Sequence, residues 1–347
     1  MCIRKQVHRS FAAFRMTFFN YLGNGGADPL ARAGTAMQRE DRLLEGAIDI
    51  HAHGYPEFTL NMPPRVDNVE WAKLASAARM RGFVIKSHLW PTAGAAHLLR
   101  GLYPDLEIFG SITLNPPAGG LSPFAVEVAA QTGAKVVWMP TWSARHDPPK
   151  HSIYLTRMQG WLKTLDASLT EFGGGVRLLG EDGKLLPVVL QILDVCKTYD
   201  LVVASGHVPV QASLLLSQET KKRGVKFVFT HPLSGSVGAS LEDQAAVVAN
   251  GGVIEHVFIG CMPMHQRADP KKIVESIRAV GPENCVMASD AIEAWNPPAP
   301  EVLRMFIASM LALGLKEDEI FQMTHDNPPR LLGLAVKRQA VAGVPGE

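Results

Sequence analysis

The chain has 347 residues, of which 47% are hydrophobic and 19% are charged, and its formal net charge is +1. This is the composition of an ordinary globular protein, and the near-zero charge gives no electrostatic basis for binding nucleic acid or an anionic membrane surface. Four widely spaced cysteines argue against a disulfide framework or a zinc knuckle and favour a reducing cytoplasm, and no apolar stretch reaches the length of a membrane span.

Residues 1–41 are predicted to be a flexible extension that precedes the folded domain. The first part is basic and carries several phenylalanines, but its apolar core is interrupted by Arg15 and is too short for a secretory signal. Residues 23–28 are rich in glycine and predict a flexible break. We therefore place one barrel domain at residues 42–336 and a C-terminal tail at 337–347. A helical arm used in self-association is the alternative for the extension, and we expect a homo-oligomer.

From Glu45 onward, short β-branched runs alternate with longer helical patterns. Such alternation indicates βαβ units, and eight runs point to the α/β class and a closed (β/α)8 TIM barrel. An open doubly wound sheet is the alternative, but no Gly-x-Gly-x-x-Gly follows a strand, so a dinucleotide site has no support. The predicted strands are 47–51, 82–88, 108–114, 135–139, 201–207, 226–231, 252–258 and 284–290. The predicted helices are 68–81, 123–132, 188–199, 210–223, 240–250, 270–280 and 299–313.

One connection, residues 141–187 between the fourth and fifth strands, is too long for a simple loop. It contains a hairpin signal over 176–186, where Asp182-Gly183 lies between two apolar runs. An insertion after a barrel strand lies on the catalytic face, so we interpret it as a lid or a substrate wall. An excursion that serves oligomer formation is an equal alternative.

Polar side chains stand at the carboxyl ends of most predicted strands. His51 and His53 end the first strand and point the same way, because strand side chains alternate between faces. Six of the 12 histidines lie at or near strand ends. In a barrel, polar residues at this edge indicate catalysis, since a packed interior has no other use for them. The other residues of this set are Lys86, His88, His207, His231, Glu255, His256 and Asp290.

Imidazoles with a carboxylate suit a divalent transition metal, for which zinc is our first choice and manganese, iron and nickel are alternatives. The ion would be held by His51, His53, His207 and either His231 or Asp290. Metal-activated hydroxide would be the nucleophile, and Asp290 would accept its proton and later deliver it to the leaving group. For His88 and His256, the alternative is a structural role as hydrogen-bonded residues of the barrel. The histidines treated as surface or loop residues are His97, His146, His151, His265 and His325.

This ordered set resembles the amidohydrolase superfamily of metal-dependent hydrolases, and the resemblance covers roughly residues 45–334. The superfamily has a (β/α)8 barrel with His-x-His after strand 1, a histidine after strands 5 and 6, and an aspartate after strand 8. The matching residues here are His51, His53, His207, His231 and Asp290. The tail that begins at Asn327 also looks like the closing Asn-Pro-Ala-Arg-Leu-Leu-Gly of that superfamily.

Lys86 is the point at which the chain departs from this pattern. Binuclear members of the superfamily bridge two metals with a carboxylated lysine or a glutamate after strand 4, and the fourth predicted strand has neither. Lys86, after the second strand, is either a carboxylated ligand in that role or a cation for a substrate carboxylate; a single-metal site without a bridge is the third alternative. We favour Lys86 as a ligand, because a buried ammonium beside a divalent cation is electrostatically poor.

The function expected from the resemblance is metal-dependent hydrolysis of a C–N or C–O bond in a small molecule, such as a cyclic amide, lactone or ester. Asp290 would shuttle the proton, and His231 or His88 would stabilise the oxyanion. A single-metal decarboxylase on the same scaffold is the second hypothesis; it requires a substrate carboxylate and a Lys86 that is not a ligand. A barrel without catalysis, kept as a binding module, is the third hypothesis and predicts no bound metal.

Overall fold

The computed structural model describes residues 37–54, 57, 64–146, 175–263 and 265–336. Within them, eight parallel strands follow one another around a nearly closed barrel in the order of the sequence. The predicted (β/α)8 fold is thus confirmed, and every predicted strand overlaps an observed one. The strands are β1 (Ile48–His53), β2 (Gly82–Lys86), β3 (Glu107–Thr113), β4 (Ala134–Trp138), β5 (Val202–Ala204), β6 (Lys226–Phe229), β7 (Val253–Val257) and β8 (Cys285–Ala288).

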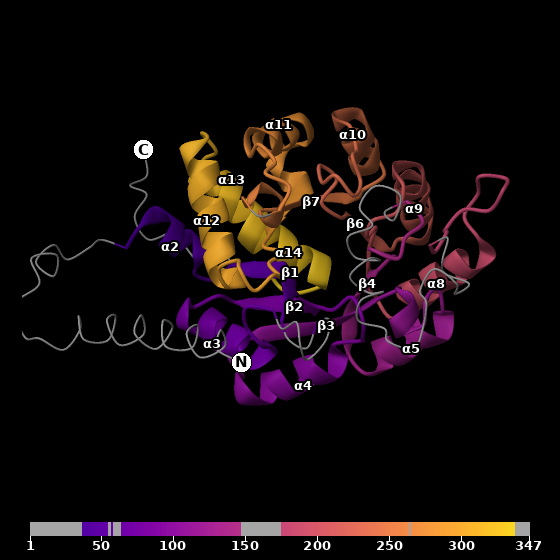
Figure 1. The fold of residues 1–347 in the computed structure, drawn as a ribbon, viewed down its shortest axis with the longest axis horizontal. Helices are drawn as coiled ribbons and strands as arrows, with labels where there is room; N and C mark the ends of the chain where they lie inside the picture. The colour runs from indigo at the N-terminus through magenta and orange to yellow at the C-terminus, as the bar shows by residue number, and fades with distance from the viewer. Residues whose placement is uncertain (1–36, 55–56, 58–63, 147–174, 264, 337–347) are drawn as a thin grey trace, which may run out of the picture. The chain divides into compact units, whose positions relative to one another are not determined.

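Helices cover the outside of the strands, with α3–α5 beside β1–β3 in Figure 1. The α-helices are α2 (Arg39–Leu44), α3 (Asn68–Ala77), α4 (Ala93–Leu102), α5 (Pro123–Gln131), α8 (Pro187–Thr198), α9 (Val210–Arg223), α10 (Leu241–Ala249), α11 (Lys271–Val280), α12 (Ala299–Ala312), α13 (Glu317–Phe321) and α14 (Asn327–Leu332). Short 3-10 turns are η2 (Pro116–Ala118), η3 (Ile259–Cys261) and η4 (Pro282–Asn284), and a π-helix, η5, spans Gln322–Asp326.

Residues from both faces of the strands are buried, as parallel strands between helices require. Every residue of β1, β2, β5 and β8 is buried, including the polar residues of β1. The apolar side chains form one continuous core that includes Trp71, Phe83 and Phe306. This core holds the strand ends rigidly, and rigid strand ends are what a catalytic constellation needs.

The barrel closes between β8 and β1 through single hydrogen bonds. No paired register joins these two strands among the described residues; instead the Asp290 N–H donates to the His51 carbonyl oxygen at 2.9 Å. Below it, the carboxylate of Asp49 accepts the N–H groups of His51 at 3.0 Å and Ser289 at 3.2 Å. Burial raises the pKa of Asp49 to about 6. The Asp49 side chain therefore supplies hydrogen bonds at this junction that strand pairing would otherwise provide.

The predicted hairpin at 176–186 is confirmed at its turn, where Leu179 and Leu185 form an antiparallel bridge and Gly183 has a φ of +74°. The middle of the predicted lid, residues 147–174, lies outside the described residues. The same holds for residues 1–36 of the predicted extension and for the predicted tail 337–347. Helix α2 begins at Arg39, three residues before the predicted boundary, and belongs to the compact unit of the barrel. No helix among the described residues is both long and apolar enough to cross a membrane.

Candidate active site

The site is built on the carboxyl end of β1, which brings two imidazoles to the carboxylate that follows β8. The Nε2 atoms of His51 and His53 lie 2.8 and 3.2 Å from Oδ1 of Asp290. Lys86, the last residue of β2, places its Nζ 2.8 Å from the same Nε2 of His51. Four of the predicted site residues therefore meet within direct contact of one another, and the histidines and the lysine are almost fully buried.

His207 and His231 approach this group from the ends of β5 and β6. Their ring centroids are 4.9 Å apart, and Nε2 of His231 is 3.9 Å from Oδ2 of Asp290. Nδ1 of His231 contacts the Ser234 hydroxyl at 2.9 Å. The structure thus brings His231 to the second carboxylate oxygen of Asp290, and the His207 ring lies next to the His231 ring.

Two of these residues have an unusual backbone. His231 has a φ of +27° and Asp290 a φ of +51°, a region that residues with a side chain rarely occupy. Such conformations cost about 1–3 kcal/mol each and persist where the surrounding structure imposes them, most often at functional sites. Both lie just past a strand end, and the conformation turns their side chains toward the same centre.

Glu255, on β7, holds His51 from behind. Its Oε1 lies 3.1 Å from Nδ1 of His51, and both side chains are fully buried. A carboxylate at this position accepts a hydrogen bond from Nδ1–H and leaves Nε2 as the atom that faces Asp290. The next residue, His256, points the other way, contacts Ser276 at 3.4 Å and belongs to the barrel wall. Its pKa falls to about 3 because it is buried.

Glu57, in the loop after β1, is a site residue that the sequence reasoning missed. Its Oε1 accepts the backbone N–H of His88 at 2.7 Å and also forms a short hydrogen bond with Nδ1 of His88. The same oxygen is 3.7 Å from Nδ1 of His53. Trp142 lies edge-on to His88, with ring centroids 4.9 Å apart. The predicted catalytic residue His88 is thus coupled to His53 through a buried carboxylate.

Burial and charge together shift the protonation of the central groups. Burial disfavours a charged imidazole at His51, but the carboxylate of Asp290 outweighs it and raises the pKa of His51. Burial lowers the pKa of Lys86. Burial alone favours a protonated acid at Asp290, yet the charge and hydrogen bond of His51 hold the pKa of Asp290 well below its ordinary value. An ionised Asp290 is the form that a ligand or a general base requires.

The donor set fits a divalent transition metal. A neutral His51 donates its Nδ1–H to Glu255 and so presents a lone pair on Nε2. This atom faces the carboxylate oxygen of Asp290 at only 2.8 Å. His53 presents Nε2 to the same oxygen. Lone pairs on two nitrogens and an oxygen that point at one another repel unless a cation or a proton lies between them. Imidazole nitrogens and a carboxylate are the ligands that zinc and its neighbours prefer.

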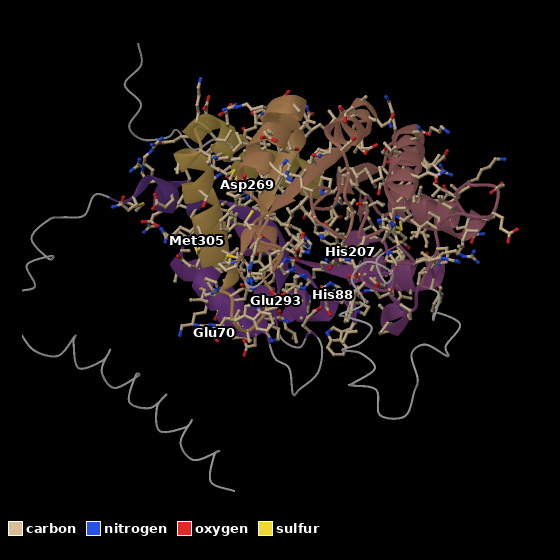
Figure 2. All side chains as sticks on the ribbon, turned by 45° about the horizontal axis from the view of Figure 1, so that its top comes forward. Glu70, His88, His207, Asp269, Glu293 and Met305 are labelled. Carbon is tan, nitrogen blue, oxygen red and sulfur yellow. The ribbon has the colours of Figure 1, made fainter. Side chains whose placement is uncertain are left out.

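A cavity of about 540 Å³ opens above this centre, and His88, His207 and Glu293, labelled in Figure 2, lie around it. His265 and Trp295 also line it. His265 lies in a turn, as expected of a loop residue, and it also faces the site: its side chain is 21% exposed and its Nε2 lies 3.9 Å from Glu293. Neither His265 nor Glu293 lies in a strand, so strand periodicity gave no signal for them.

The expectation that His325 is a surface or loop residue is wrong. It is buried in the π-helix η5, where Nε2 contacts the Glu45 carbonyl oxygen at 2.7 Å and the ring stacks on Phe321. Burial lowers its pKa to about 4. Its role is structural, because it ties the C-terminal helices to the loop before β1.

Several solved structures share this architecture. An amidohydrolase from Pseudomonas aeruginosa matches with a TM-score of 0.52 at 13% identity, over 84% of this chain and 97% of that one. YJJV, a TatD homologue from Escherichia coli K12, matches with a TM-score of 0.51 at 16% identity, over 84% and 100%. A structure from the engineering of organophosphate hydrolysis activity from a weak promiscuous lactonase template has a TM-score of 0.54 at 11% identity, over 84% and 97%. The chain thus has the amidohydrolase-type barrel fold that its sequence predicted.

Within that fold class, the chain belongs to a particular sequence family, the family of unknown function DUF6282, whose model matches residues 46–255. The matched region runs from the loop before β1 into β7. It therefore includes His51, His53, Lys86 and His207 but ends before Asp290. No curated protein matches the chain.

Proposed function

We propose that this protein is a metal-dependent hydrolase that cleaves a C–N or C–O bond in a small molecule, such as a cyclic amide, a lactone or an ester. The observation that carries the proposal is the convergence of two Nε2 atoms, from His51 and His53, on the ionised carboxylate of Asp290 at the base of the cavity. A buried arrangement of this kind is costly unless it serves a site. The amidohydrolase and the lactonase template among the structures with this fold accord with such chemistry.

In this proposal His51, His53 and Asp290 hold a divalent metal, with His207 and His231 next to them and Lys86 as a further ligand. Zinc is our first choice, and manganese, iron and nickel have the same ligand preferences. When bound, such an ion polarises the substrate carbonyl and lowers the pKa of water at its open position. The partly closed cavity excludes bulk water, which strengthens every electrostatic interaction at the centre.

The chain's own residues then divide the remaining work. Asp290 holds the attacking water, takes its proton on the carboxylate and returns that proton to the leaving nitrogen or oxygen. His231, oriented through Ser234, faces the position of the carbonyl oxygen and stabilises the charge that develops there. His88 was the second residue predicted for this role, but its Nδ1–H is donated to Glu57 and burial lowers its pKa to about 3. Its Nε2 therefore offers a lone pair, and His88 suits the role of a ligand or acceptor better than that of an oxyanion donor. The apolar lining residues Val257 and Ile292 contact the body of the substrate.

Lys86 also keeps the decarboxylase hypothesis in consideration. It is the one lysine or arginine among the described residues that line the cavity. As an ammonium it would pair with a substrate carboxylate, and it would then not be a ligand. A Lys86→Gln variant separates the two functions: a hydrolase loses bound metal, whereas a decarboxylase retains its metal and loses affinity for carboxylate substrates.

The test combines metal analysis with a substrate screen. The chelator-treated protein is reloaded with Zn²⁺ or Mn²⁺, and its metal content and its turnover of lactones, cyclic amides and carboxylic esters are measured. We expect turnover that requires metal, and loss of both in the double variant His51→Ala, His53→Ala. A reloaded protein that holds less than about half an equivalent of metal, or a double variant that retains its turnover, would remove the proposal.

A further inference from the structure

A second cluster of ligand-type atoms lies on the other side of His53 from Asp290. His53, Glu57 and His88 each offer one ligand atom, and these atoms all lie within 4.8 Å of one another. The His53 and His88 rings stack almost parallel, 4.8 Å apart and 6° from coplanar orientation. None of the three side chains is more than about a tenth exposed. The cluster therefore combines two imidazoles and a carboxylate in a dry environment.

Two atoms of this cluster have no hydrogen-bond partner among the described residues. They are Nδ1 of His53 and Oε2 of Glu57, and both are buried. Nδ1 of His53 lies 3.7 Å from Oε1 of Glu57, which is too far for a hydrogen bond. A buried polar atom without a partner costs about 1–3 kcal/mol, and more when the group is charged. Two such atoms on facing side chains indicate that a further group belongs between them.

We propose that His53, Glu57 and His88 form a second site for a divalent transition metal, separate from the centre at His51, His53 and Asp290. Two imidazole nitrogens and a carboxylate oxygen make up a ligand set of the type that zinc takes. His53 would serve both positions, with Nε2 directed to Asp290 and Nδ1 to Glu57. Because His53 would bind a metal through each nitrogen, its single ring proton must leave to solvent, whereas His88 keeps one ring proton. The imidazolate of His53 and the carboxylate of Glu57 offset the charge of the ion.

The competing interpretation is that Glu57 only orients the ring of His88. That role accounts for Oε1, which accepts both the backbone and the ring N–H of His88. It leaves Oε2 of Glu57 and Nδ1 of His53 without partners. A cation satisfies both atoms, which is why the second metal position is the better account of the cluster.

The experiment counts metal ions bound by the full chain. Chelator-treated protein is titrated with Zn²⁺, passed through a desalting column and analysed for metal per chain, and thermal melting confirms the fold of each variant. The wild type should hold about two equivalents and Glu57→Gln about one, because a neutral amide is a poor zinc ligand. Glu293→Gln is the matched control: it neutralises a cavity carboxylate outside the cluster and should retain about two equivalents.

This inference rests on the proposed metal centre, and the outcomes separate the two. A wild type that binds no zinc contradicts the proposed function itself. About one equivalent in both the wild type and Glu57→Gln overturns the second site and leaves the first intact. If Glu57→Gln does not fold, His88→Gln decides, because one equivalent in that variant supports the site and two equivalents refute it.

Discussion

Three of the site histidines have a partner outside the centre that contacts Nδ1 and thereby directs Nε2 inward. Glu255 does so for His51, Ser234 for His231 and Glu57 for His88. A neutral imidazole has one proton, so the partner of one nitrogen decides the chemistry of the other. These supporting residues define which lone pairs reach a metal or a substrate.

Glu255→Gln should weaken metal binding without removing a ligand. The neutral amide oxygen accepts a weaker hydrogen bond from the Nδ1–H of His51 than a carboxylate does, so the ring is less basic and less firmly oriented. We expect metal affinity to fall about 10–100-fold, the usual cost of such a change. Competition with a chelator of known affinity measures it, with Glu293→Gln as the control. An affinity equal to that of the wild type would show that Glu255 plays no part in the metal centre.

Asp290→Asn should separate binding from proton transfer. The asparagine oxygen is still able to ligate, but the amide cannot accept a proton from water. We expect kcat to fall about 10²–10⁴-fold, the contribution typical of a general base, with little change in KM. The comparison is made at equal metal occupancy. If kcat at full occupancy stays within a few-fold of the wild type, another group is the base.

Strand alternation explains why part of the site was predictable at this scale. His51 and His53 share a face because they are two residues apart on a strand, and His207, His231 and Asp290 each lie two or three residues past a strand end. Glu57 and Glu293 lie in loops, where the sequence does not define the direction of a side chain. The sequence shows a glutamate at 57, but only the path of the loop brings its oxygen to His88.

At the scale of elements, Gly206 shapes the edge of the barrel on which His207 stands. It has a φ of +62°, and a Cβ at this position would lie 2.3 Å from the Met139 carbonyl oxygen. The close approach allows the His207 N–H to donate to the Pro140 carbonyl oxygen at 3.0 Å. Glycine therefore permits the ends of β4 and β5 to meet, and the position of His207 depends on it.

Gly206→Ala should destabilise the protein and displace His207. Both the positive φ and the clash with backbone act against a side chain, so we expect a loss of at least about 1–3 kcal/mol in the free energy of unfolding. Gly101→Ala is the control: it lies in α4 with open space around it and should be neutral or stabilising by about 0.5–1 kcal/mol. Urea denaturation measures both. Equal effects of the two substitutions would refute the role of Gly206.

His325 should make stability depend on pH through the π-helix η5. Its pKa is about 4 in the folded protein, against 6.5 as the ordinary value, so the unfolded chain binds the proton more readily. The contribution of neutral His325 to the free energy of unfolding is complete above pH 6.5. It falls by about 3 kcal/mol in total as the pH falls toward 4. His325→Gln removes this dependence. The stability difference between wild type and variant, measured by denaturation from pH 7 to pH 4, should narrow as the pH falls; a constant difference would contradict the assignment.

Among the described residues, all eight strands and seven of the helices were predicted, whereas α2, α4, α13 and α14 were not. Strands buried on both faces appear as continuous apolar runs, which is why all eight were found. Helix α4 was missed because its sequence contains Gly94 and Gly101 and its N-cap residue Thr92 makes no side-chain capping bond. Packing on the barrel stabilises this helix, and packing is not visible in the local sequence.

At the scale of the whole molecule, a bound metal should stabilise the entire barrel. The proposed ligands come from β1 and from the residues after β5, β6 and β8, so the complete ligand set forms only when the barrel is closed. Zn²⁺ at 100 times its dissociation constant should add about 2.7 kcal/mol to the free energy of unfolding and raise Tm. Calorimetry with and without a chelator measures the shift, and His51→Ala, His53→Ala should show none. A chelator that leaves the Tm of the zinc-loaded wild type unchanged would contradict a site that spans the barrel.

The junction of β1 and β8 also has a consequence for synthesis on the ribosome. His51 and Ser289, which are hydrogen-bonded across it, are 238 residues apart in the chain. The imidazoles of β1 therefore leave the exit tunnel long before the carboxylate of Asp290 exists to meet them. A nascent chain holds the histidines in an open, incomplete barrel, so the proposed metal centre would be completed only at the final stage of folding, after the last strand has been released.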